Sequence, residues 1–118
     1  MTLQELYINI DEDINPVMSR LMSESLIKKL ICMLPEDTTL TDLNSSLAAG
    51  DCQKAFVSAH TLKSILSNLG FTKAAEIDTV IVEELRKGTI NDIVLNKTAE
   101  LNTVYDNIMR CILACLNK

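Results

Sequence analysis

Apolar residues recur along this chain at alternating intervals of four and three, which is the spacing of one buried face of an α-helix. The longest such stripe consists of Val94, Thr98, Leu101, Tyr105, Ile108, Ile112 and Cys115, and a second consists of Ala55, Ala59, Leu62, Leu66 and Leu69. The chain has only three glycines and two prolines, which leaves little material for a β fold rich in turns. The pattern therefore predicts an all-α protein.

Capping residues and helix breakers between the stripes set the ends of the predicted helices. Helices are expected over residues 2–8, from Asn15-Pro16 onward, from Ser23 or Ser25 to Pro35, from Thr39 or Thr41 to Gly50, from Asp51 to Gly70, from Thr72 to Gly88, and from about 92 to 116. Short connections between long helices favour antiparallel neighbours. We therefore expect one domain over residues 1–118, with an antiparallel four-helix bundle at about residues 41–116 and short N-terminal helices packed across it.

Composition and charge narrow the possible functions. The hydrophobic fraction is 47%, but the aromatic residues are only two tyrosines and two phenylalanines, so the core must be mainly aliphatic. A net charge of −5 argues against binding to nucleic acid or to anionic membrane surfaces. Membrane insertion is not expected either, because no apolar run approaches the roughly 20 residues of a membrane span. Residues 1–6 show no secretion signal, so a cytoplasmic location is expected.

The four cysteines, Cys32, Cys52, Cys111 and Cys115, show no Cys-x-x-Cys pairing. Without a secretion signal they are interpreted as reduced, partly buried thiols. Cys111 and Cys115 are four residues apart on one predicted helix, a spacing that could hold two metal ligands. A metal site would need further ligands, and the single, distant histidine of the chain cannot supply them. We therefore expect no metal site.

That histidine, His60, lies on the helix predicted between Asp51 and Gly70. At roughly 100° per residue it points about 140° away from the middle of the buried stripe. Lys63, Ser64 and Ser67 lie within about 60° of it, one or two turns further along. The spacing therefore predicts an imidazole that faces solvent beside a cation and two hydroxyl groups.

The run Ala59-His60-Thr61-Leu62-Lys63-Ser64, closed by Leu69-Gly70, resembles the motif of histidine phosphotransfer (HPt) domains. That family has an Ala-His-x-Leu-Lys-Gly run followed by a Leu-Gly pair a turn and a half later. Residues 47–51 (LAAGD) and 84–88 (ELRKG) are also similar to the flanking helix ends of the family. The likeness extends over about residues 11–116 and is firmest over 43–88. A motif of this length with both flanks is much more specific than a lone histidine.

The resemblance implies a phosphorelay intermediate rather than an enzyme. In that reading His60 accepts a phosphoryl group from a receiver-domain aspartate or a histidine kinase and passes it to the receiver domain of another response regulator, while Lys63 stabilises the phosphate. The expected partners are a response-regulator receiver domain and a sensor or hybrid histidine kinase of a two-component system. The chain needs no cofactor of its own, because the partner receiver brings the aspartate and the Mg²⁺.

Four further residues of the motif, Ser64, Ser67, Asn68 and Gly70, are candidates for shaping the site. Ser64 departs from the family, which most often has glycine there, and Gly70 is explained sufficiently as a helix C-cap. Phe56, one turn before the histidine, is interpreted as an edge of the core, with a docking surface as the alternative.

A second departure concerns the next helix. Many HPt domains place Gln or Glu 22 residues after the histidine to orient the imidazole, and that position is Val82 here. Asp78 or Glu83 could compensate. The predicted buried face of this helix is Ala74, Ile77, Ile81 and Leu85. Val82 is therefore expected at its flank, where a Val82→Gln substitution should be tolerated.

Two other classes of function remain open. One is a non-catalytic helical interaction module in which His60 is incidental. The other is an enzyme, which the sequence argues against, because there is no Gly-rich phosphate loop and the motif brings no carboxylate partner for the histidine.

Overall fold

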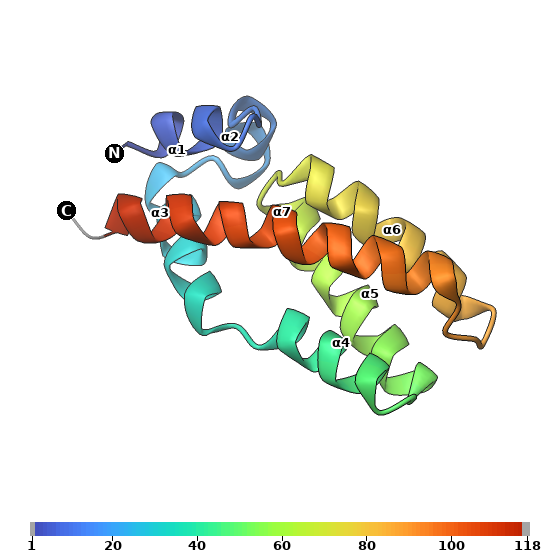
Figure 1. Ribbon diagram of the computed structural model, residues 1–118. Helices are drawn as coiled ribbons and strands as arrows, with labels where there is room; N and C mark the ends of the chain where they lie inside the picture. Colours follow the sequence, from blue (N-terminus) through green and yellow to red (C-terminus); the bar gives the residue numbers. More distant parts are fainter. Residues whose placement is uncertain (1, 117–118) are drawn as a thin grey trace.

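The protein folds into helices joined by short connections, as a computed structural model shows for residues 2–116, the part of the chain described here. The elements are α1 (Leu3–Asn9), α2 (Asn15–Leu21), α3 (Glu24–Met33), the 3₁₀ turn η1 (Leu34–Glu36), α4 (Thr39–Ala48), α5 (Cys52–Asn68), α6 (Thr72–Arg86) and α7 (Asp92–Leu116) (Figure 1). No strand occurs within residues 2–116. The predicted all-α class is confirmed.

The four longer helices of the C-terminal part pack in chain order and reverse direction at each turn (Figure 1). Helix α5 lies between α4 and α6, and α6 also packs against α7. Helices α4 and α7 are linked by Asn44 and Asn102, whose side-chain amides exchange two hydrogen bonds of 2.9 and 3.0 Å. Because these amides are half-buried, each satisfies the other where water has limited access.

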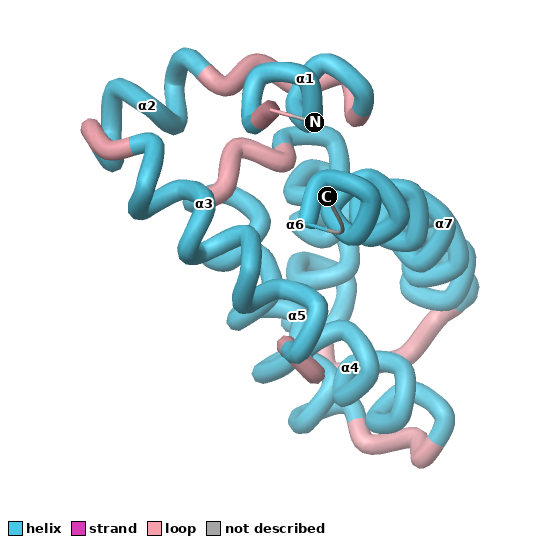
Figure 2. The backbone as a smooth tube through the Cα atoms, turned by 90° about the vertical axis from the view of Figure 1, so that its left-hand side faces the viewer, coloured by secondary structure: helices cyan, strands magenta, loops and turns pink. Residues whose placement is uncertain are grey.

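Helices α1, α2 and α3 gather at the end of the molecule where α7 terminates (Figures 1 and 2). There α1 and α3 contact α7, so the last helix ties the N-terminal part to the rest. All of these helices share one mainly aliphatic core, to which α1 contributes Leu6 and Tyr7, and α3 contributes Ile27 and Ile31. Each helix described in residues 2–116 is too short or too polar to cross a bilayer.

The N-terminal helices dock on the α5–α6 turn, which we define as residues 67–71. The hydroxyl of Tyr7 donates a buried hydrogen bond to the Leu69 carbonyl, and its ring lies 5.7 Å from that of Phe71. Gly70 has a φ of +73°, and a Cβ there would overlap the Val17 side chain. Gly70 is therefore required by backbone conformation and by close packing, as well as ending α5 as predicted.

Local capping explains most of the helix starts. Ser23 caps α3 and Asp51 caps α5, each accepting a hydrogen bond of 3.1 Å from a backbone N–H three residues on. The prediction that Thr72 caps α6 is wrong. Phe71 occupies the N-cap position, and the first turn instead receives a carboxylate from far along the chain: Glu12 accepts a 3.0 Å hydrogen bond from the Lys73 N–H. Asp11 pairs with the Lys73 ammonium beside it.

The cysteines follow the expectation in part. Cys52, Cys111 and Cys115 are half-buried, as predicted for structural thiols. Cys32 is exposed, so the expectation of partial burial is wrong for it. It lies on the outer side of α3, where the neighbouring Ile31 takes the buried position.

Candidate functional site

His60 projects from the middle of α5 into solvent. The helix buries Ala55, Ala59, Leu62 and Leu66 against its neighbours, and these four side chains have no exposed surface. His60 is exposed on the other side of the same helix, so the orientation predicted from the spacing is confirmed. Its exposure makes the ring accessible to a second molecule.

An aromatic ring and a guanidinium group flank the imidazole. The Phe56 ring centroid lies 5.9 Å from that of His60, with the two planes inclined at 39°. The guanidinium carbon of Arg86, near the end of α6, lies 5.2 Å from the Phe56 centroid on a cation–π contact. Phe56 is half-buried against the core, as expected for a core edge, and it also packs beside the functional candidate. Arg86 is held in turn by Glu83, at 3.4 Å.

Lys63 lies one turn beyond His60 on α5 and is half-buried. It makes no direct ion pair with a carboxylate of residues 2–116, although five other cations in this part of the chain do. Its ammonium group is therefore available to an incoming anion.

Behind Lys63 lies a buried carboxylate, Asp78 of α6. The Asp78 side chain has no exposed surface, and neither of its oxygens has a hydrogen-bond partner among the described residues. Burial raises the pKa of Asp78 to about 7, and the positive charge of Lys63 opposes that rise. The chain reverses direction near Gly70, between α5 and α6, with Lys63 seven residues before the glycine and Asp78 eight after it, so the two residues lie at a similar level of the packed helix pair.

We refer to Phe56, His60, Lys63, Asp78 and Arg86 as the His60 cluster. Sequence reasoning did not assign a role to Arg86, which it treated only as part of a flanking helix end. It mentioned Asp78 without placing it. A usable signal existed: Asp78 lies four residues from Ala74 and four from Val82, the spacing of a buried helix face.

The predicted flank position of Val82 is wrong. Val82 is completely buried, and the buried face of α6 consists of Ala74, Ala75, Asp78, Ile81, Val82 and Leu85. Ile77, predicted to be buried, is only partly so. The physical reason is that α6 packs against both α5 and α7, so it buries a broader arc than a single stripe would. Val82 lines the core and offers the imidazole no polar group, while Glu83 is exposed and engaged with Arg86.

The remaining residues proposed to shape the site divide between two places. Ser64 and Ser67 are exposed on α5. The backbone carbonyls of Ser67 and Asn68 accept hydrogen bonds of 3.0 and 2.8 Å from Arg20, so this end of α5 is joined to α2. Gly70 lies at the junction with Val17, ten residues beyond the histidine. Gly70 and the two carbonyls therefore belong to the α5–α6 turn and its contacts with α2, and they do not contact the imidazole.

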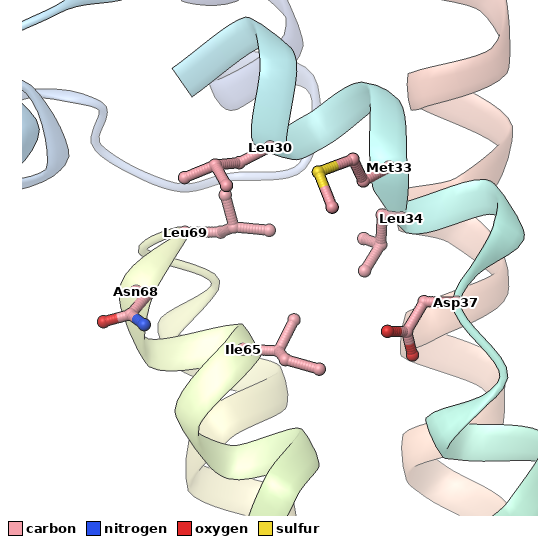
Figure 3. A pocket seen from close by; sticks show the side chains of 7 residues that line it. All are labelled: Leu30, Met33, Leu34, Asp37, Ile65, Asn68 and Leu69. Atoms are coloured by element: carbon pink, nitrogen blue, oxygen red, sulfur yellow. The ribbon is translucent and has the colours of Figure 1, made fainter. Parts of the chain in front are cut away.

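Asn68 also stands at the edge of an apolar pocket of about 170 Å³ between α3, η1 and α5 (Figure 3). The pocket is lined by Leu30, Met33, Leu34, Asp37, Ile65, Asn68 and Leu69. Ile65 follows His60 by five residues and therefore projects about 140° away from it. The pocket and the imidazole thus occupy different faces of α5.

Comparison of the chain with protein-family models, with curated proteins and with solved structures finds no match. No group of three or more metal-ligating side chains occurs in the described part of the chain.

Proposed function

We propose that this protein is a phosphoryl carrier of the HPt type, in which His60 accepts and donates the phosphoryl group of a phosphorelay. The observation that supports this most strongly is the exposed imidazole with an uncommitted lysine one turn away, within a run that resembles the HPt motif. The alternating packing of α4, α5, α6 and α7 supports a four-helix bundle as the architecture of the carrier.

The proposed chemistry requires little from the carrier. The lone pair of the neutral imidazole attacks the phosphorus of a receiver aspartyl phosphate; a P–N bond forms as the P–O bond to the aspartate breaks. The donor carboxylate leaves with the electron pair, and the second ring nitrogen keeps its proton. Transfer to the next receiver reverses these steps. In-line phosphoryl transfer depends mostly on positioning and charge compensation, and the partner receiver supplies the aspartate and the Mg²⁺.

The two cations of the His60 cluster, Lys63 and Arg86, can offset the negative charge of a phosphoryl group on the imidazole. Lys63 can turn toward a phosphoryl group on the ring without first breaking an ion pair. Arg86 adds a second positive charge to the cluster, and it contacts the Phe56 ring that packs beside the imidazole. An anion bound to His60 would therefore have cations of two adjacent helices in its surroundings.

A docking surface for the receiver surrounds the histidine. Val57 is an apolar residue that is 62% exposed, and it lies one turn before His60 on the same helix. Two shallow hollows meet at Gln53 and Val57, one on the α4 side and one on the α6 side. We propose that the receiver covers Val57 and the Phe56 edge and so brings its aspartate over the imidazole. Receiver and kinase partners of this kind imply a cytoplasmic location.

The test is to mix the protein with a panel of phosphorylated receiver domains and to measure phosphate that is labile in acid and stable in base. We expect labelling of the wild type and complete loss in His60→Gln. Because His60 is exposed, the variant should keep the helicity and melting temperature of the wild type. Undiminished labelling of His60→Gln would refute the proposal.

A non-catalytic interaction module is the second candidate. It is favoured by the apolar pocket of Figure 3, which is lined in part by the 61% exposed Met33. The pocket lies on a different face of α5 from His60. Binding of a partner that survives in His60→Gln, together with no labelling by any donor, would favour this candidate over the carrier.

A further inference from the structure

We propose that Asp78 is a positioning residue: an internal counter-charge that draws Lys63 toward the α5–α6 interface and thereby limits how firmly Lys63 holds a phosphoryl group on His60. This inference rests on the proposed function and deepens it. It assigns to the carrier a built-in means of keeping phosphohistidine transferable.

Asp78 is a buried acid that makes no structural hydrogen bond within the described residues. Both oxygens of Asp78 lie inside the protein, and no N–H or O–H of the described residues donates to them. Such a group is costly, because an unpaired buried carboxylate loses its hydration without replacement. A purely structural position facing α5 would be served better by an apolar residue, as the neighbouring Ile81 and Val82 show.

The level of Asp78 in the helical hairpin places it next to Lys63. The contact between Phe56 and Arg86 shows the register of the two helices, because Phe56 lies 14 residues before Gly70 and Arg86 lies 16 after it. Lys63 and Asp78, which lie 7 residues before and 8 after Gly70, have nearly the same register closer to the turn. The Cys52 thiol meets the Leu85 carbonyl at 3.6 Å, so the two helices also stay in contact at the end of the hairpin far from the turn.

Among the charged groups of the helices around Asp78, Lys63 is the one that can act as its counter-ion. Lys63 of α5 is the charged group that acts on the Asp78 carboxylate. On α7, Lys97 and Glu100 pair with each other at 3.2 Å and line a surface groove with Ile77 and Val80, on a different side of α6. On α4, Asn44 is committed to Asn102. One carboxylate thus competes with the phosphoryl group for one ammonium.

This competition predicts how the charge of Asp78 changes the lifetime of phosphohistidine. While Asp78 is ionised, Lys63 divides its attraction between the carboxylate behind it and the phosphoryl group on His60. When Asp78 is neutral, or is replaced by an amide, Lys63 is committed to the phosphoryl group alone, and phosphohistidine becomes longer-lived. We expect about a threefold longer half-life in Asp78→Asn at pH 8, a typical size for one partly exposed charge pair.

The first experiment needs no phosphorylation. The Asp78 carboxyl carbon is followed by NMR as a function of pH in the wild type, Lys63→Gln and Lys63→Arg, with Lys54→Gln as a control that removes an exposed lysine from the same helix. Loss of the Lys63 charge should move the Asp78 midpoint upward, whereas Lys63→Arg and Lys54→Gln should leave it nearly unchanged. An unchanged midpoint in Lys63→Gln would overturn the inference.

The second experiment uses potassium phosphoramidate as a small chemical donor, so that no partner protein is required. Phosphohistidine lifetimes are compared in the wild type, Asp78→Asn, Lys63→Gln and the double variant. The lifetime gained in Asp78→Asn should disappear in the Lys63→Gln background, because the effect acts through Lys63. A gain that persists in the double variant would mean a merely structural role and would overturn the inference.

The two experiments separate this inference from the proposed function. If receivers never transfer phosphate to the protein but the Asp78 midpoint responds to Lys63, the carrier proposal fails and the charge coupling stands. If receivers label His60 but neither the midpoint nor the lifetime responds, the carrier stands and the role of Asp78 fails. Should Asp78→Asn not fold, the titration of the native carboxyl decides alone.

Discussion

The α5–α6 turn and the His60 cluster differ in how their polar groups are used. At the α5–α6 turn, the groups contributed by the N-terminal helices have partners: the Tyr7 hydroxyl meets a carbonyl, Arg20 meets two, and Gly70 fits against Val17. In the His60 cluster, the imidazole is exposed, Lys63 has no direct ion pair among the described residues, and Asp78 is buried without a hydrogen-bond partner there. The turn is organised for stability, whereas the cluster keeps its polar groups available. Stability and reactivity can therefore be altered separately.

The largest effect on stability is expected at the turn, in Gly70→Ala. The new methyl group must adopt a φ of +73° and overlap Val17, so the free energy of unfolding should fall by about 3 kcal/mol. Urea denaturation measures this, with Gly50→Ala as the control. Gly50 also has a positive φ, +71°, but has nothing within 4 Å of the added Cβ. Equal losses in the two variants would show that packing against Val17 does not matter.

The next effect concerns the cluster and depends on pH. The pKa of Asp78 is raised to about 7 in the folded protein, against roughly 3.9 unfolded, so the folded state binds more protons between these values. The stabilising contribution is complete below about pH 4 and is lost as the pH rises through about 7. Between pH 5 and 8 the wild type should lose about 2.5 kcal/mol relative to Asp78→Asn. Urea denaturation at several pH values measures the difference, and Glu76→Gln, on the exposed side of α6, should track the wild type.

A smaller loss is expected when a second polar group is added behind the cluster. Val82→Gln places an amide in a fully buried apolar position and should lower the free energy of unfolding by about 2 kcal/mol. Val80→Gln, at a 37% exposed position on the same helix, should change it little. Thermal denaturation of both variants makes the comparison. Equal stability of the two would mean that the helix can rotate or open enough to hydrate residue 82.

The smallest effect is expected from one hydroxyl at the turn. Tyr7→Phe removes the donor to the Leu69 carbonyl and should cost about 1 kcal/mol. Tyr105→Phe is the matched control, because the buried Tyr105 hydroxyl has no hydrogen-bond partner within residues 2–116. That substitution should be neutral or slightly stabilising. A loss in Tyr105→Phe as large as in Tyr7→Phe would contradict the assignment of the Tyr7 bond.

Sequence reasoning succeeded where the determinants are local. The exposure of His60 follows from the spacing of apolar residues on its own helix, and the start of α5 follows from Asp51, three residues before the N–H that it caps. Both depend on neighbours within one or two turns. The same locality explains why the helical class of the protein could be predicted.

The sequence predictions failed where burial or placement of a residue depends on packing between segments that are distant in the sequence. Val82 is buried because α6 packs against both α5 and α7, which buries a broader arc than the apolar pattern of α6 indicates. The pairing of Arg86 with Phe56 and the placement of Asp78 behind Lys63 both depend on the register between two helices. Periodicity within one helix does not encode that register.

The carboxylate that Glu12 contributes to the start of α6 has a consequence for how the chain folds. The two residues joined by that hydrogen bond are 61 positions apart, so α6 can acquire this cap only after a long loop has closed. Local turns and helices form earlier than contacts of such separation. Helix α6 should therefore nucleate with a frayed first turn against α5, and its amide protons nearest Lys73 should gain protection from exchange last, when the N-terminal helices arrive.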